Sequence, residues 1–151
     1  MNIALRAVSR ADLAALARIH AQCFTEDAWD AAALAGVLAM SGAEARLAEE
    51  AGRPVGLLFA TILGEEAEIL TFGVAPEARG RGIARMLLAD LFARARGRGA
   101  GRVVLEVAAD NGAALALYES EGFRTVGLRH AYYHRERGPA IDAWLLRRVL
   151  D

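Results

Sequence analysis

The stretch PEARGRGIARMLLADL, residues 76–91, lies between a segment typical of a β-strand and a segment typical of a helix. Its two glycines, Gly80 and Gly82, allow the backbone to turn sharply and to approach another molecule closely. The N-terminus of the following helix presents unpaired N–H groups and a partial positive charge. Such a loop can hold an anion, most often a phosphate. The alternative is a solvent-exposed turn whose arginines are hydrated.

A second run of similar composition, RGRGAGR at residues 96–102, serves as a control. It follows a predicted helix and precedes a predicted strand, so the helix presents its partially negative C-terminal carbonyls there. We interpret this second run as a helix end and a turn. Only the segment Arg79–Arg85 has the order of strand and then helix that an anion site requires.

Two common nucleotide-binding loops do not fit this segment. The P-loop pattern ends in a lysine, and the chain contains no lysine. The dinucleotide pattern G-x-G-x-x-G also fails, because Arg85 stands where its third glycine is expected. Neither of these nucleotide classes is therefore supported.

Composition narrows the class of protein. The 151 residues are 55% hydrophobic, which predicts a single globular domain over residues 1–151 with a substantial core. The net charge of −1 offers no general attraction to nucleic acid or to anionic membranes. A single cysteine, Cys23, is typical of a reducing compartment. With no apolar run near the roughly 20 residues of a membrane helix and no signal peptide, we expect a cytoplasmic protein.

Hydrophobic spacing predicts the order of the secondary structure. Helical periodicity predicts helices over 13–20, 30–40, 82–96 and 111–121. A capping-box pattern at residues 9–12 precedes the first of them. Alternating and β-branched runs predict strands over 43–50, 55–63, 67–74, 102–107, 125–134 and 140–149. This order favours an α/β fold with a mixed sheet and helices on both faces. Gly73 interrupts the strand over 67–74 and is interpreted as a β-bulge.

A second motif, LEVAADNGAALALYESEGF at residues 105–123, identifies a family when it is combined with three other stretches. These are FGVAPEARGRGIARMLL at 72–88, GLRHAYY at 127–133 and AIDAWLL at 140–146. Together they resemble the GNAT acyltransferases, which transfer acetyl from acetyl-coenzyme A (acetyl-CoA) to amines. Within that family they are similar to the RimI type, which acetylates protein N-termini, typically an N-terminal alanine on a small-subunit ribosomal protein such as S18. The resemblance covers roughly the C-terminal half of the chain. It implies the GNAT fold, with a mixed, mostly antiparallel sheet.

The resemblance implies that acetyl-CoA is the co-substrate. The loop over 79–85 would bind its diphosphate with backbone N–H groups and the helix dipole. An N–H near Val74 would stabilise the oxyanion formed when the thioester is attacked. Asn111 is a helix N-cap by local chemistry and a coenzyme contact by resemblance. The residues assigned to acetyl-CoA binding are Phe72, Gly73, Val74, Arg79, Gly80, Arg81, Gly82, Ile83, Ala84, Arg85 and Asn111.

Two residues carry the predicted chemistry, and each has a structural alternative. Glu106 interrupts the apolar strand over 102–107, where a carboxylate is costly unless it is paired or lies at an open cleft. The alternative is a strand-end glutamate bonded to a neighbouring backbone group or to an arginine; by resemblance Glu106 is the general base, acting directly or through one water. Tyr118 is either a packed aromatic or, by resemblance, the acid that protonates the coenzyme A thiolate.

The acceptor side is less defined. Tyr132 and Tyr133 are consecutive on a strand and should face opposite sides, one in the core and one in the acceptor groove. Arg129, Asp142 and Glu26 are candidates to orient the acceptor. The three histidines lack metal-ligand spacing, so we expect no metal. Cys23 has no histidine partner, so direct attack by the amine is favoured over an acetyl-cysteine intermediate.

Two alternative functions stay open. An acidic acceptor pocket would favour a small-molecule amine such as a polyamine or an aminoglycoside, and five glutamates make one conceivable: Glu44, Glu49, Glu65, Glu66 and Glu68. A sensor that holds acetyl-CoA without turnover is disfavoured because Glu106 and Tyr118 are both present. The sequence leaves monomer and weak dimer open.

Overall fold

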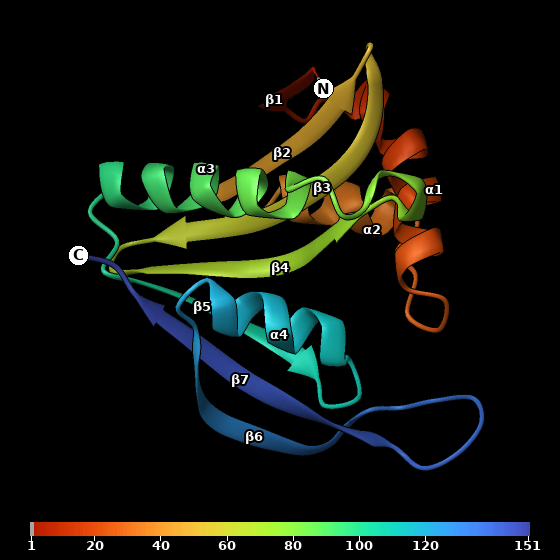
Figure 1. Ribbon diagram of the computed structural model, residues 1–151, viewed down its shortest axis with the longest axis vertical. Coiled ribbons are helices and arrows are strands. Elements are labelled where there is room, and N and C mark those ends of the chain that lie inside the picture. The colour runs from red at the N-terminus through yellow and green to blue at the C-terminus, as the bar shows by residue number, and fades with distance from the viewer. Residues whose placement is uncertain (1) are drawn as a thin grey trace.

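A computed structural model describes residues 2–151 (Figure 1). Seven strands form one sheet in the order β1-β2-β3-β4-β5-β7-β6. The strands are β1 Ile3–Ala7, β2 Ala43–Glu50, β3 Arg53–Leu63, β4 Glu66–Val74, β5 Arg102–Ala108, β6 Arg124–Tyr133 and β7 Ile141–Val149. β4 and β5 pair in parallel, and the other five neighbouring pairs are antiparallel. The predicted mixed, mostly antiparallel sheet is confirmed.

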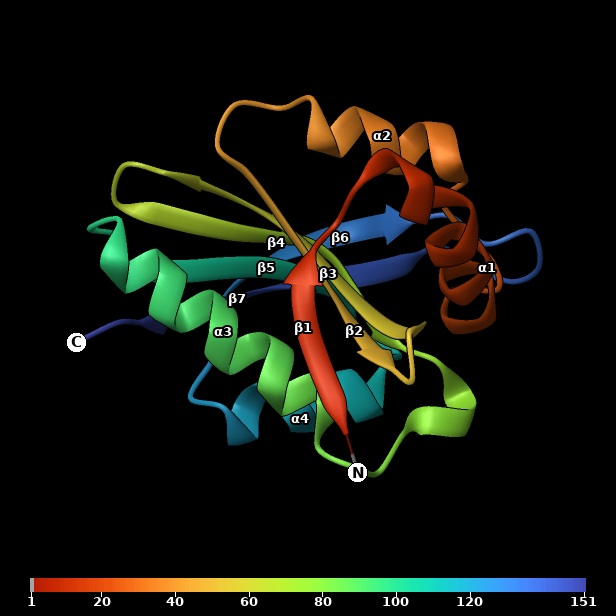
Figure 2. The same cartoon turned by 90° about the horizontal axis from the view of Figure 1, so that it is seen from above.

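Four α-helices cover the two faces of this sheet (Figure 2). They are α1 Leu13–Cys23, α2 Ala31–Leu38, α3 Ile83–Gly97 and α4 Gly112–Ser120, with short 3-10 helices at η1 Arg10–Asp12 and η2 Pro76–Ala78. One buried cluster packs α1 and α2 onto one face, with Leu16, Leu34 and Phe59 fully buried. A larger cluster packs α3 and α4 onto the other face. The sheet is therefore the middle layer between two cores.

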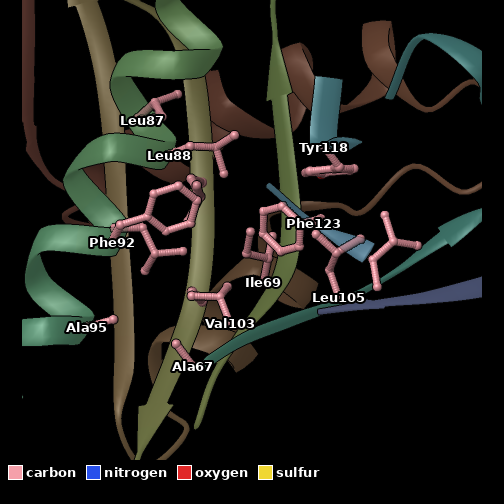
Figure 3. Packing of buried hydrophobic residues seen from close by; sticks show 14 of the residues in the cluster. Ala67, Ile69, Leu87, Leu88, Phe92, Ala95, Val103, Leu105, Tyr118 and Phe123 are labelled. Atoms are coloured by element: carbon pink, nitrogen blue, oxygen red, sulfur yellow. The ribbon is translucent and has the colours of Figure 1, made fainter. Parts of the chain in front are cut away.

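The larger core explains why α3 has a fixed position. Leu87, Leu88, Leu91 and Phe92 are all at most 4% exposed and belong to this cluster. Figure 3 shows Leu87, Leu88 and Phe92 pointing from α3 onto the sheet. Burying a side chain of this size contributes about 1.5–3 kcal/mol relative to leaving it in water. Because the stripe is so well packed, the N-terminus of α3 is held firmly beside the end of β4.

The parallel pair β4–β5 is short. It runs from Glu66–Arg102 to Ile69–Leu105, and beyond this point the two strands separate. At the same place the register between β3 and β4 shifts, because consecutive β3 residues pair with Ile69 and Thr71. Leu70 is therefore the extra residue of a β-bulge. The separation opens the sheet between the second half of β4 and the second half of β5, next to the two sequence motifs at 72–88 and 105–123.

The bulge predicted at Gly73 is thus wrong in position. Gly73 pairs regularly with Leu57 of β3. A Cβ atom placed on Gly73 would lie 3.0 Å from the Sγ of Cys23 at the end of α1. The physical reason for this glycine is the close approach of α1 to β4 rather than a kink in the strand.

Other boundaries agree with the sequence to within a few residues, apart from β1. That strand was not predicted because IALRA is a short edge strand without clear alternation. The capping box is present, with the Ser9 amide donating to Asp12 Oδ2 at 2.7 Å. The control segment 96–102 is indeed a helix end and a turn, with Gly99 in the left-handed region at φ 83°. Within residues 2–151 no helix is long and apolar enough to cross a membrane.

Candidate active site

The separation of β4 from β5 creates two adjoining cavities of about 490 and 450 Å³. The larger one, here called the donor cavity, contains the glycine loop and the start of α3. The other, the acceptor cavity, lies between β5, the segment after α1 and the start of the β6–β7 loop. Six residues line both cavities: Cys23, Phe24, Phe72, Asn111, Ala114 and Tyr118. The cavities therefore form one continuous cleft.

The donor cavity is built mainly from backbone. Gly80 and Gly82 have φ values of 78° and 81°, in the left-handed region that favours glycine. The first backbone bond of α3 runs from the Met86 amide to the Gly82 carbonyl at 3.1 Å. The amides of residues 83–85 consequently have no partner inside the helix and lie at the cavity. This end of the cavity can accommodate an anion.

The three loop arginines have different positions. Arg79 lines the donor cavity, and its Nε donates to the Val74 carbonyl at 3.0 Å. Arg85 also lines the cavity. The Arg81 side chain instead pairs with Glu50 of β2, with Nη1 3.0 Å from the carboxylate, and is not part of the cavity lining. A contact from Arg81 to an anion in this cavity would therefore have to come from its backbone.

Backbone groups of β4 also face the cleft. The Ala75 amide donates to Val55 of β3 at 2.8 Å, and successive amides along a strand point to opposite sides. The Val74 amide therefore points away from β3, toward the gap left by β5. The Val74 carbonyl lies on this same side and accepts from Arg79 and from the Cys23 thiol at 3.3 Å. The Val74 amide therefore faces the cleft, as the oxyanion role predicted for an N–H near Val74 requires.

Tyr118 and Asn111 stand where the two cavities meet. Tyr118 is 7% exposed, and its ring centroid lies 5.4 Å from that of Phe123 and 6.1 Å from that of Phe72. Figure 3 shows Tyr118 and Phe123 side by side. Burial raises the pKa of Tyr118, so the phenol keeps its proton at neutral pH. Asn111 caps α4, its Oδ1 accepting from the Ala114 amide at 3.2 Å. The predicted N-cap is confirmed.

Glu106 lies in the acceptor cavity on the strand that has separated from β4. Its side chain is 22% exposed, and its Oε1 lies 3.1 Å from Nε of Arg129 on β6. Arg129 thus contacts the candidate base rather than the cavity itself. Burial and the neighbouring carboxylates of Glu106 and Glu66 raise the pKa of Glu68. Glu106 itself forms an ion pair with Arg129 and also lines the acceptor cavity, so it is both paired and accessible from the cleft.

His20 has a role that the sequence did not reveal. It is 1% exposed and stacks on Phe24, with ring centroids 4.3 Å apart. Its Nδ1 accepts from the Trp29 amide at 3.0 Å, so the ring proton sits on Nε2, which donates to Thr71 Oγ1 at 2.8 Å. Burial lowers the pKa of His20 to about 4. This neutral ring joins α1, the segment after it and β4 along one wall of the acceptor cavity.

The tyrosine pair differs from the prediction. Tyr133 lines the acceptor cavity, whereas Tyr132 is 44% exposed, so neither lies in the core. The reason is a register shift between β6 and β7 around Ala131, whose φ of 51° breaks the alternation. Asp142 supports this irregularity, because its Oδ1 accepts from the Ala131 amide at 2.8 Å. Asp142 therefore shapes β6 and does not line the cavity.

Arg135, on the β6–β7 loop, was not singled out in the sequence. Its guanidinium lies 2.8 Å from Glu26, 2.8 Å from Asp27 and 3.4 Å from Asp110, and the side chain is only 15% exposed. All four residues line the acceptor cavity. Glu26, a candidate to orient the acceptor, is thus engaged by this arginine.

The five glutamates that an acidic acceptor pocket could use do not converge. Glu44 pairs with Arg94 and Arg98 of the α3 segment, Glu49 with Arg6, and Glu66 with Arg102. None of the five lines the acceptor cavity. Among residues 2–151, no group of three or more His, Cys, Asp or Glu side chains is arranged to hold a metal ion.

Comparisons with known proteins agree with this geometry. The model of the acetyltransferase (GNAT) family matches residues 13–123. The chain is 42% identical to N-alpha-acetyltransferase RimI of Mycobacterium tuberculosis, over 97% of this chain and 92% of that protein. It is 40% identical to the [ribosomal protein bS18]-alanine N-acetyltransferase of Salmonella typhimurium, over 49% of this chain and 50% of that protein. The crystal structure of the ribosomal-protein-S18-alanine N-acetyltransferase from Escherichia coli superposes with a TM-score of 0.89, at 25% identity, over 99% and 95% of the two chains.

Proposed function

The chain belongs to the GNAT family and is an acetyl-CoA-dependent N-acetyltransferase of the RimI type, and from this premise we propose that it acetylates the α-amine of a protein N-terminus that begins with alanine. The proposed acceptor is a small-subunit ribosomal protein of the S18 type. The proposed site of the reaction is the cytoplasm. The carrying observation is the continuous cleft, in which a backbone anion site, Tyr118 and Glu106 follow one another.

Acetyl-CoA occupies the donor cavity in this proposal. The amides of residues 83–85 and the positive end of α3 bind its diphosphate. Phe72, Gly73 and Val74 run along the pantetheine arm, whose amides can pair with the cleft-facing backbone of β4. The thioester then lies at the junction of the two cavities, beside Tyr118.

Glu106 acts on the acceptor amine. An N-terminal α-ammonium has a pKa near roughly 7.7–8.0, so a good fraction is already neutral at cellular pH. Glu106, directly or through one water, accepts the remaining proton. The freed nitrogen lone pair attacks the thioester carbonyl carbon. The Val74 amide donates a hydrogen bond to the oxyanion of the tetrahedral intermediate.

Collapse of the intermediate breaks the C–S bond and expels the thiolate. Tyr118, still protonated, donates its proton to the sulfur. The nitrogen loses its second proton as the amide forms; this proton restores the Tyr118 phenol, and the proton held by Glu106 passes to solvent. The amine has then released two protons and the sulfur has gained one, so each turnover yields one acetamide, one thiol and one proton to solvent.

A peptide screen tests the acceptor. Synthetic peptides identical except for their first residue are incubated with acetyl-CoA, and the acetylated position is located by mass spectrometry. We expect one acetyl group on the α-amine, with alanine-led peptides giving the highest kcat/KM. Acetylation of spermidine but of no peptide, or of side-chain amines only, would contradict the proposal.

A further inference from the structure

We propose that Arg135 is a specificity-determining residue of the acceptor cavity, and this inference rests on the function proposed above. By binding three carboxylates at once, Arg135 holds the β6–β7 loop in place for a peptide chain. It also withholds those carboxylates from polycationic amines.

The first step is the geometry. Glu26 and Asp27 belong to the segment that follows α1, Asp110 to the turn before α4, and Arg135 to the loop between β6 and β7. The guanidinium reaches all three carboxylates at 2.8–3.4 Å. In Figure 1 the β6–β7 loop extends on the same side of the molecule as the segment after α1. One side chain therefore fastens three loops around the acceptor cavity.

The second step is the environment of the guanidinium. An exposed ion pair contributes only about 0–1 kcal/mol, because water and salt screen it. Arg135 is 15% exposed and also lies over the Tyr133 ring, 5.6 Å from its centroid. A partly buried, multiply bonded arginine holds its partners in a defined geometry better than an exposed lysine could. The arginine is therefore the most buried member of this group, and its three carboxylate partners are 43–53% exposed at the rim of the cavity.

The third step is the charge balance. Three carboxylates face one guanidinium, so without Arg135 the cavity rim would carry three uncompensated negative charges. Such a rim attracts a flexible polycation, whose second and third ammonium groups would bind there. With Arg135 in place all three carboxylates are already ion-paired. The arginine thus favours a singly charged peptide terminus over a polyamine.

The test compares Arg135→Met, Arg135→Lys and a matched control, Arg137→Met, an exposed arginine of the same loop. Steady-state kinetics are measured with an alanine-led peptide, with spermidine and with varied acetyl-CoA. For Arg135→Met we expect the peptide KM to rise about tenfold and the spermidine KM to fall several-fold. The KM for acetyl-CoA should stay the same, because none of the four residues lines the donor cavity. Arg135→Lys should recover part of the peptide KM, and Arg137→Met should match the parent.

A double variant, Glu26→Gln with Asp27→Asn, separates the two effects and serves if Arg135→Met does not fold. It also releases the loop, so the peptide KM should rise, but it removes carboxylates, so the spermidine KM should not fall. The inference is overturned if Arg135→Met leaves the ratio of the peptide KM to the spermidine KM unchanged. It is also overturned if Arg137→Met changes this ratio as much as Arg135→Met does. A parent enzyme that acetylates no peptide overturns the proposed function instead, and the spermidine KM of Arg135→Met still decides the role of Arg135.

Discussion

The two sides of the cleft are built by different means. The donor cavity is formed by consecutive residues, chiefly the segment 72–85, and its polar groups are mainly backbone amides. The acceptor cavity is held by side chains from distant parts of the sequence. His20 and Thr71 are 51 residues apart, and Arg135 and Asp27 are 108 apart. The donor side should therefore tolerate side-chain changes that spare its backbone, whereas the acceptor side should depend on single side chains.

The largest expected effect is on the acceptor side. Glu106→Gln keeps the shape of the side chain but removes the base, so kcat should fall by about 10²–10⁴-fold. Binding of acetyl-CoA, measured by calorimetry, should not change, because Glu106 does not line the donor cavity. A variant that turns over at the parental rate would exclude Glu106 as the base.

The next effect concerns the His20 ring and pH. The folded pKa of about 4 lies below the unfolded value of 6.5, so the unfolded chain binds more protons between these two pH values. Stability is therefore highest above pH 6.5 and falls as the pH drops toward 4, by up to about 3 kcal/mol from this residue. Urea unfolding at pH 7.5 and 4.5 should show a smaller pH-dependent loss for His20→Gln. Equal losses in parent and variant would contradict this assignment.

A smaller effect is expected from a substitution that strains the backbone of the glycine loop in the donor cavity. Gly82→Ala introduces no clash, since nothing lies within 4 Å of the added Cβ, but it strains a residue at φ 81°. That strain costs about 1–2 kcal/mol, so the KM for acetyl-CoA should rise roughly tenfold. The KM for the peptide should stay unchanged. Gly36→Ala in α2 is the control: it adds the same methyl group at another uncrowded position and should leave both constants unchanged.

The smallest effect is expected at Arg81. Its side chain pairs with Glu50 and does not line the donor cavity, and an ion pair of this exposure contributes about 0–1 kcal/mol. Arg81→Gln should thus change the KM for acetyl-CoA by no more than about threefold. A loss as large as that of Gly82→Ala would mean that the guanidinium binds the diphosphate directly, and the donor side would no longer be a backbone site.

The same contrast explains what the sequence could predict. The loop over 79–85 was recognisable because glycines, strand and helix stand next to one another in the chain. Glu106 stood out because a charge in an apolar strand is unusual. Arg135 gave no such signal, since its partners lie 25 and 108 residues away. The predicted helix over 13–20 includes His20, but the tautomer of its ring and its hydrogen bond to Thr71 depend on packing that no local pattern encodes.

Two errors have the same cause. Gly73 was interpreted as a bulge because a glycine in a strand is ambiguous, and its neighbour Cys23 is distant in sequence. One of the two consecutive tyrosines was expected in the core, and the left-handed Ala131 that precedes them is fixed by Asp142 of another strand. In both cases a contact between segments outweighed the local pattern.

The main-chain cradle at the start of α3 also affects how such an enzyme can diversify. Amides are present whatever side chain a codon specifies. If the loop binds the diphosphate as proposed, its exposed positions other than Gly80 and Gly82 can therefore change without loss of the acetyl donor, whereas the buried Ile83 cannot change freely. The opposite wall changes whenever one arginine or one histidine is replaced. New acceptors can therefore be reached by single substitutions, while the chemistry that supplies the acetyl group is inherited intact.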